Sequence, residues 1–142
     1  MADDVLLNKA AAIERAVARA REEYAGDDAN LLGNQTKQDA ILLNLQRACE
    51  STIDAAMHLV RIHRLGIPQE TREAFDLLER ASLIDASLAA RLRKMVGFRN
   101  IAVHNYQRVD LEIVKAILTE RLEDFLKFTR ILTTPQGPPG QV

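Results

Sequence analysis

The stretch Lys37–Leu65, KQDAILLNLQRACESTIDAAMHLVRIHRL, decides the fold, because it contains neither Gly nor Pro over its whole length. Apolar or small side chains recur along it every three or four residues, which is the spacing of one face of an α-helix. They include Ile41, Leu42, Leu45, Cys49, Ile53, Ala56 and Val60. A long helix with one apolar face needs other helices to cover that face. The stretch therefore predicts a helix, ended by Gly66, inside a helical bundle.

Four further segments show the same helical spacing. They are Val5–Tyr24, a short segment over 71–80, a segment beginning at Ser82 or Asp85, and one that begins after Asp110 and ends before Pro135. The polar stretch 26–36 between the first two helices predicts a loop, with Asn34 or Thr36 as the cap of the long helix. We therefore expect an all-α fold, an antiparallel bundle of four long helices and one short one.

The size and charge of the chain limit what it can do. Its 142 residues suit a single domain, which we place at 1–134, followed by a disordered Pro/Gly-rich tail at 135–142. The formal net charge is -1, so no overall positive field attracts nucleic acid, and any contact with RNA must be local. No basic leader or long apolar run is present, which predicts a cytoplasmic protein without a membrane span.

Cysteine and histidine give little sign of a metal site. The single Cys49 falls on the apolar stripe of the long helix, where a buried, unreactive thiol is expected. His58 and His63 are five residues apart on the same helix, about 140° around its axis, whereas a pair of helical metal ligands is usually three or four residues apart. We therefore expect neither a metal nor another cofactor, with His63 packed in the core or at the helix end.

The run Gly97–Tyr106, GFRNIAVHNY, gathers polar side chains where the fourth helix is expected to end. The side chain of histidine titrates near neutral pH, so His104 can take a proton from a ribose 2′-OH. The planar guanidinium of Arg99 can bind phosphate oxygens through two parallel N–H groups. Arg99 and His104 are therefore the candidate catalytic residues, and Asn100 and Asn105 the candidate RNA contacts. The residues alone leave an alternative open, because Arg and His near a helix end also serve as dipole partners and Asn105 as a turn residue.

The spacing from Arg99 to Tyr106 resembles the Arg-x4-His-x-Tyr signature of HepT-type HEPN toxins. Similarity to that family extends to the segments around Asp39 and His58, to Gly66-Ile67-Pro68, to Phe75–Leu78 and to Lys94–Asn100, and so covers roughly residues 5–132. The resemblance implies a ribonuclease toxin that forms a homodimer, in which both copies of the motif line one cleft. The reaction described above for His104 and Arg99 needs no metal ion.

The resemblance further implies a partner, a nucleotidyltransferase antitoxin of the MntA type that transfers AMP groups from ATP to the motif tyrosine. In this sequence that residue is Tyr106. The added phosphates would bring negative charge and bulk beside His104 and so exclude RNA. Two alternatives stay open: a non-catalytic HEPN subunit that binds a nucleotidyltransferase or a nucleotide, with Arg99 as a phosphate clamp, and a purely structural helical dimer.

Overall fold

The computed structural model describes residues 3–136, and every regular element in that range is a helix. This confirms the predicted all-α bundle. In chain order the elements are α1 (Asp4–Tyr24), α2 (Asp28–Leu32), α3 (Gln35–Ile62), α4 (Thr71–Arg80), α5 (Ala86–His104), the 3-10 turn η1 (Tyr106–Arg108), α6 (Leu111–Ala116), the π-helical turn η2 (Ile117–Arg121) and α7 (Leu122–Thr133).

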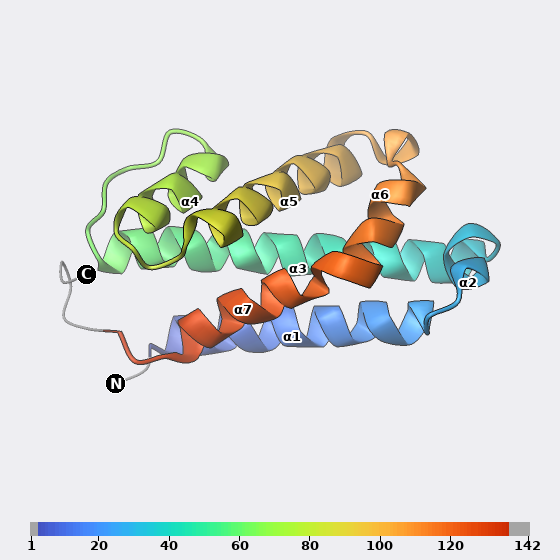
Figure 1. The fold of residues 1–142 in the computed structure, drawn as a ribbon, viewed down its shortest axis with the longest axis horizontal. Coiled ribbons are helices and arrows are strands. Elements are labelled where there is room, and N and C mark those ends of the chain that lie inside the picture. The colour runs from blue at the N-terminus through green and yellow to red at the C-terminus, as the bar shows by residue number, and fades with distance from the viewer. Residues whose placement is uncertain (1–2, 137–142) are drawn as a thin grey trace.

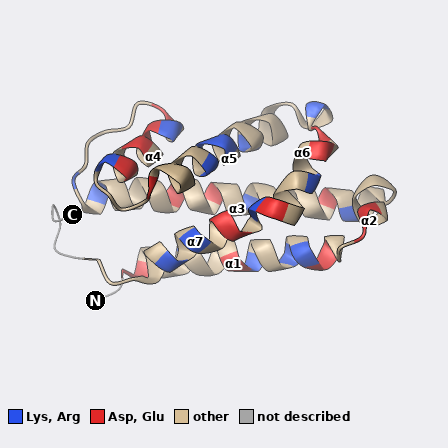
Figure 2. Cartoon of the chain, in the orientation of Figure 1, with Lys and Arg blue, Asp and Glu red and all other residues tan. Residues whose placement is uncertain are grey.

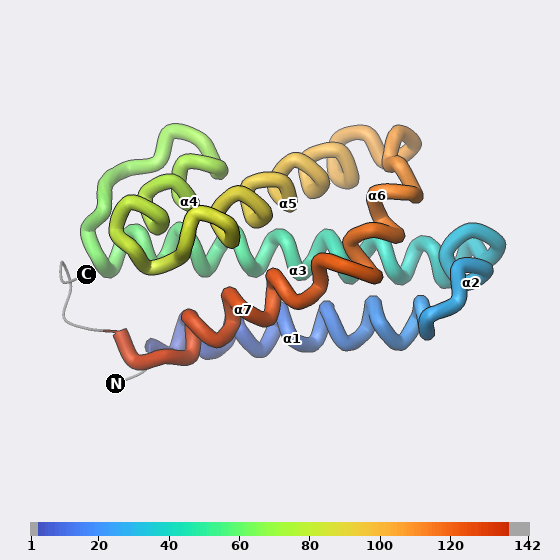
Figure 3. The backbone as a smooth tube through the Cα atoms, in the orientation of Figure 1, coloured from blue at the N-terminus to red at the C-terminus, as the bar shows by residue number. Residues whose placement is uncertain are grey.

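The two longest helices, α1 and α3, lie side by side and run in opposite directions (Figure 1). Helix α7 packs against α1, whereas α4 and α5 pack on α3 and on each other. The tube in Figure 3 shows how α6 and η2 carry the chain from the end of α5 back across the bundle to α7. Helix α5 runs in the opposite direction to α3, so the end of α5 lies close to the beginning of α3, where Tyr106 hydrogen bonds to Asp39.

Aromatic side chains join α4 to α7 inside the hydrophobic core. Phe75 of α4 and Phe128 of α7 are fully buried, and their rings meet edge to face with centroids 6.3 Å apart. Burial of each such side chain stabilises the fold by about 1.5–3 kcal/mol. The short α4 is therefore anchored through its apolar face, although it has fewer than three helical turns.

Polar side chains cap the helices at positions that the sequence indicated. The carboxylates of Asp85 and Asp110 accept hydrogen bonds from the backbone N–H groups of Leu88 and Glu112, at 2.7 and 2.9 Å. Of the two candidate caps for α3, Asn34 fulfils the role, because its side chain accepts from the N–H of Lys37 at 3.0 Å. Each cap satisfies a backbone donor that the helix leaves unpaired, which stabilises it by about 1 kcal/mol.

The structure corrects three details of the predicted helices. The expected loop over 26–36 contains the one-turn helix α2, which is capped by Asp27 and buries Leu31. Helix α3 ends at Ile62 rather than at Leu65, because Arg64 takes a left-handed conformation with φ of 54°. The last predicted helix is divided by η2, where the wider π-turn interrupts regular α-helical spacing.

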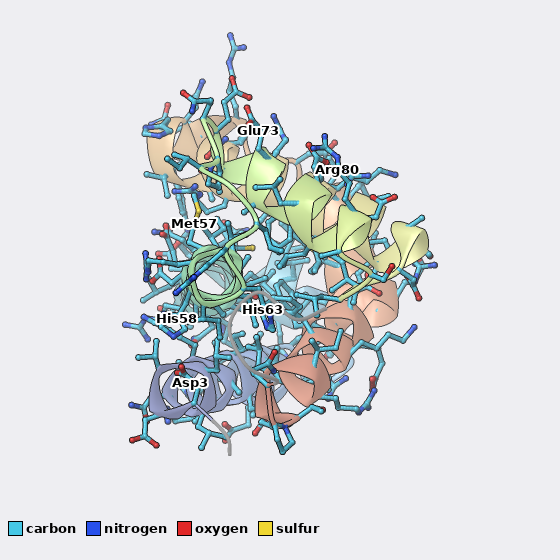
Figure 4. The ribbon with its side chains drawn as sticks, turned by 90° about the vertical axis from the view of Figure 1, so that its left-hand side faces the viewer. Asp3, Met57, His58, His63, Glu73 and Arg80 are labelled. Atoms are coloured by element: carbon cyan, nitrogen blue, oxygen red, sulfur yellow. The ribbon has the colours of Figure 1, made fainter. Side chains whose placement is uncertain are left out.

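The histidines of α3 have structural partners at one end of the bundle (Figure 4). His58 hydrogen bonds through Nε2 to the carboxylate of Asp3, which also caps α1, at 3.0 Å. His63 is buried, ends α3, and hydrogen bonds to Gln136 at 2.8 Å, as expected for a packed residue at a helix end. Most of the predicted tail, residues 137–142, lies outside the described residues.

Candidate active site

The motif residues lie at the C-terminal end of α5 and in the turn that follows it. Helix α5 contains four basic residues and no acidic one, namely Arg91, Arg93, Lys94 and Arg99. Elsewhere on the helices of the bundle, charges of both signs are mixed (Figure 2). Acids of neighbouring helices pair with three of these four cations, so the positive charge of α5 is partly neutralised; the pairs are Arg91–Asp124, Arg93 with Asp76 and Glu79, and Arg99–Glu50.

Arg99 lies on the side of α5 that faces α3. Its side chain is only 18% exposed, and its Nη1 is 3.7 Å from the carboxylate of Glu50 on α3. The Nε atom is buried without a hydrogen-bond partner among the residues that the structure describes. An unpaired buried donor costs free energy, so a ligand oxygen that reached this guanidinium would replace a long ion pair and satisfy a free N–H group.

His104 is the last residue of α5 and is exposed. Within residues 3–136 its imidazole makes no hydrogen bond or ion pair, so both ring nitrogens are accessible to a ligand. Five residues separate it from Arg99, about 140° around the helix, which is the same offset as between His58 and His63. The two side chains therefore leave α5 in different directions, and helical geometry alone does not bring them together on one face.

Tyr106 connects the turn after α5 to the first part of α3. Its hydroxyl donates a hydrogen bond of 2.6 Å to Asp39, and the side chain is 44% exposed. Partial burial of the phenol, together with the hydrogen bond to Asp39, raises the pKa of Tyr106 to about 12. The hydroxyl is therefore protonated at neutral pH and held in one direction at the surface.

The two asparagines of the motif occupy different surroundings. Asn105 ends α5 with its N–H donating to the carbonyl of Ile101 and its carbonyl accepting from Arg108, as expected for a turn residue. Asn100 lines a cavity of about 340 Å³ between α4 and α5. The structure thus gives Asn105 a backbone role, while the side chain of Asn100 faces open space.

Cys49 and the remaining polar groups have no catalytic arrangement. Burial raises the pKa of the Cys49 thiol to about 12, which agrees with the expected unreactive side chain. Among residues 3–136 no three His, Cys, Asp or Glu side chains are grouped so as to hold a metal ion. In the same part of the chain, no helix is both long and apolar enough to cross a bilayer.

The sequence did not assign a role to two acidic residues of this site, Asp39 and Glu50. Both lie on α3, eleven positions apart, and after three helical turns they return to the same face. Asp39 accepts a hydrogen bond from Tyr106, and the carboxylate of Glu50 lies near Arg99. Helix α3 therefore places two carboxylates beside the motif. The helical spacing of the two acids was visible in the sequence, but the packing of α5 on that face was not.

Comparison with known protein families gives one match to a family model. The model for ribonuclease HepT-like proteins matches residues 13–132. Among curated proteins, the mRNA nuclease HepT of Shewanella oneidensis is 45% identical over 130 residues, which is 92% of this chain and 97% of the relative. A protein of Archaeoglobus fulgidus named as a putative RNase is 34% identical over 88 residues, covering 62% of this chain and 66% of the relative.

Solved structures give the same result. The chain superposes on the tri-AMPylated HEPN toxin of Shewanella oneidensis, solved in complex with an MNT antitoxin, with a TM-score of 0.88 and 44% identity, over 94% of this chain and 99% of the other. A toxin–antitoxin structure with AMP-PNP matches with a TM-score of 0.88 and 43% identity, over 94% of this chain and 100% of the other. The cytosolic protein YutE of Bacillus subtilis, at 14% identity and a TM-score of 0.67, shares the fold only.

Proposed function

Because the chain belongs to the ribonuclease HepT-like family, we propose that it is the ribonuclease toxin of a toxin–antitoxin pair and that Arg99 and His104 cleave the RNA. The observation that carries this proposal is the exposed end of α5, where an imidazole without a partner and a weakly paired guanidinium occupy a helix that contains no acid. The relative that shares 45% identity over 92% of the chain is named as an mRNA nuclease.

The proposed reaction uses the 2′-OH of the RNA as the nucleophile. His104 accepts the proton of that hydroxyl, whose oxygen attacks the neighbouring phosphorus while the bond to the 5′ oxygen breaks. The leaving 5′ oxygen takes up a proton, so the products are a 2′,3′-cyclic phosphate and a 5′-OH end. Negative charge grows on the non-bridging oxygens in the transition state, where Arg99 stabilises it more than in the ground state.

Arg99 must leave Glu50 or share its contact for this to occur. The separation of 3.7 Å is long for an ion pair, so the contact holds the guanidinium weakly. A phosphate offers two oxygens to the planar fork and a stronger, charge-assisted pair of hydrogen bonds. Asn100 and Asn105 remain candidates for further RNA contacts through their side-chain amides.

The experiment that tests this function is RNA cleavage by the purified protein in excess EDTA. Since the proposed acid–base and electrostatic groups both come from side chains, cleavage should continue at an unchanged rate in the chelator. The products should carry 2′,3′-cyclic phosphate ends. Complete loss of cleavage in EDTA, restored by a divalent cation, would contradict the assignment of the chemistry to Arg99 and His104.

A second copy of the chain completes the site in this proposal. Ile101 and Ile113 are 45% and 50% exposed beside the buried Phe98, and together they line a largely apolar cavity of about 420 Å³ next to the motif. Because His104 is within about 60° of Ile101 around α5, burial of these side chains against the same surface of a second molecule would bring the two His104 side chains towards one axis.

Measurement of the mass in solution tests the dimer. We expect a homodimer at micromolar concentration, and Ile113→Asp should shift the protein towards the monomer and lower RNA cleavage in parallel. Val5→Asp is the matched control, because Val5 is comparably exposed, at 43%, and lies at the beginning of α1, at the opposite end of the bundle from α6 (Figure 1). A monomeric parent protein with full ribonuclease activity would rule out the shared site.

The partner in this proposal is a nucleotidyltransferase antitoxin. The solved Shewanella toxin, which is 44% identical to this chain, is AMPylated and bound to an MNT antitoxin. Tyr106 supports the same control here, because its hydroxyl is exposed, held by Asp39, and only two residues from His104. AMP phosphates on this oxygen would occupy the site of the scissile phosphate and pair with Arg99 in place of RNA.

A further inference from the structure

The structure points to a second phosphate-binding position on the RNA path, and we propose that Arg72 of α4 forms it. This inference rests on the proposed ribonuclease function and adds a binding residue outside the motif. The ligand is a backbone phosphate of the RNA that flanks the scissile one. Arg72 lies in the first turn of α4 and is exposed.

Gly97 provides the space that Arg72 occupies against α5. A Cβ atom at position 97 would lie 2.8 Å from Nη2 of Arg72, closer than such atoms approach one another. The absence of a side chain therefore lets the guanidinium lie directly on the motif helix, two residues before Arg99. Its Nε donates a long hydrogen bond of 3.4 Å to the carbonyl of Arg93, which orients the fork.

The charge of Arg72 is not neutralised by a neighbour. Among the described residues no carboxylate lies within ion-pair distance of it, whereas Arg93 on the facing helix contacts both Asp76 and Glu79, at 2.9 and 3.2 Å. The terminal nitrogens of Arg72 therefore keep their N–H donors for a ligand. A guanidinium in this state is suited to bind phosphate, because its planar fork pairs with two oxygens.

Further donors line the same cavity. The space of about 340 Å³ between α4 and α5 is lined by Arg72, Thr71, Asn100, Val96 and Glu70. The hydroxyl of Thr71 and the amide of Asn100 can donate to phosphate oxygens beside the guanidinium. Glu70 is the acidic side chain of this lining, and its charge opposes an anion there, so it limits the affinity of the position.

The cavity also lies on the same side of α5 as the proposed base. Gly97, Asn100 and His104 are spaced by three and four residues, which keeps them within about 60° around the helix. Seven residues separate Gly97 from His104, or about 10 Å along the axis. An RNA strand with its scissile phosphate at His104 can therefore place a neighbouring phosphate at Arg72. Although the net charge of the chain is -1, this unpaired arginine directs RNA to one surface of the protein.

Binding of a cleavage-resistant RNA oligonucleotide, fully 2′-O-methylated, tests the position without relying on catalysis. We expect Arg72→Ala to weaken binding roughly ten-fold, as the loss of one charge-assisted contact does, and to lower the slope of log affinity against log salt by about 0.7. Gly97→Ala keeps the charge but displaces the guanidinium, so it should weaken binding as well. Arg80→Ala is the matched control, because Arg80 lies exposed at the other end of α4 (Figure 4).

Cleavage kinetics separate the position from the catalytic pair. With an RNA of a dozen nucleotides, Arg72→Ala should raise KM with little change in kcat, whereas a dinucleotide substrate should be cleaved as by the parent. If the parent cleaves RNA and Arg72→Ala binds and cleaves like Arg80→Ala, this inference is wrong and the proposed function stands. If Arg72 governs RNA binding but the parent cleaves nothing, the phosphate position stands and the proposed ribonuclease function fails.

Discussion

Replacement of His104 by alanine is expected to lower RNA cleavage by a factor on the order of 10²–10⁴, the usual contribution of a positioned general base. His104 is exposed at the last turn of α5 and has no side-chain partner in the described part of the chain, so the variant should fold like the parent. Expression of the parent without its antitoxin should arrest growth, and His104→Ala should abolish that arrest. The rate of RNA cleavage and the growth curve measure the two effects.

Variants of Arg99 test the second catalytic residue, because a substitution can keep its positive charge while removing the planar guanidinium. Arg99→Lys keeps the positive charge but loses the planar fork, and we expect it to lose activity on the order of 10²–10³-fold, close to Arg99→Ala. Recovery to near the parental rate in Arg99→Lys would show that only a diffuse charge is needed. No growth arrest on expression of the parent alone would instead favour a non-catalytic HEPN subunit.

The second large effect is expected at Tyr106. Co-expression with the proposed nucleotidyltransferase partner should add AMP-sized mass increments to the parent protein, and Tyr106→Phe should show none. In the proposed transfer, the Tyr106 oxygen attacks the α-phosphorus of ATP, the bond to pyrophosphate breaks, and the phenolic proton passes to Asp39, which already accepts its hydrogen bond. Because the pKa of Tyr106 is raised to about 12, the phenol needs such an acceptor at neutral pH.

Tyr24 is the matched control, since it is the other tyrosine of the chain. It is only 7% exposed, and its hydroxyl donates to Asp28, so a transferase has little access to it. Tyr24→Phe should therefore keep the mass increments. Tyr106→Phe should cleave RNA at the parental rate and resist silencing by the partner, whereas increments that persist in this variant would refute the assignment of Tyr106 as acceptor.

Most of the fold could be predicted from the sequence, because long helices with one apolar face leave a clear periodic signal. Helices α1, α3 and α5 were predicted in this way, Asp110 indicated the beginning of α6, and Asp85 was one of two candidates, with Ser82, for the beginning of α5. The five-residue helix α2 was missed because it has too few turns to show a period. The end of α3 was misplaced because the left-handed Arg64 stops the helix before Gly66, the first visible breaker.

The candidate site was predictable only in part. The Arg-x4-His-x-Tyr spacing is local and therefore visible in the sequence, as was the position at a helix end. The contacts of these residues depend on how separate helices pack, so the sequence did not indicate that Glu50 pairs with Arg99 or that Asp39 holds Tyr106. The approach of Arg72 to Gly97 is likewise a result of packing between α4 and α5.

The central claim is that His104 activates the 2′-OH at the cut site, and a single modified substrate tests it most directly. An RNA with one strong cleavage site is prepared with either a ribose or a 2′-O-methyl ribose at that position, and the product ends are identified by mass spectrometry. We expect a 2′,3′-cyclic phosphate from the ribose substrate and no cleavage at the methylated position. Cleavage of both substrates at equal rates would contradict the claim, because the nucleophile could then not be the hydroxyl that His104 is proposed to activate.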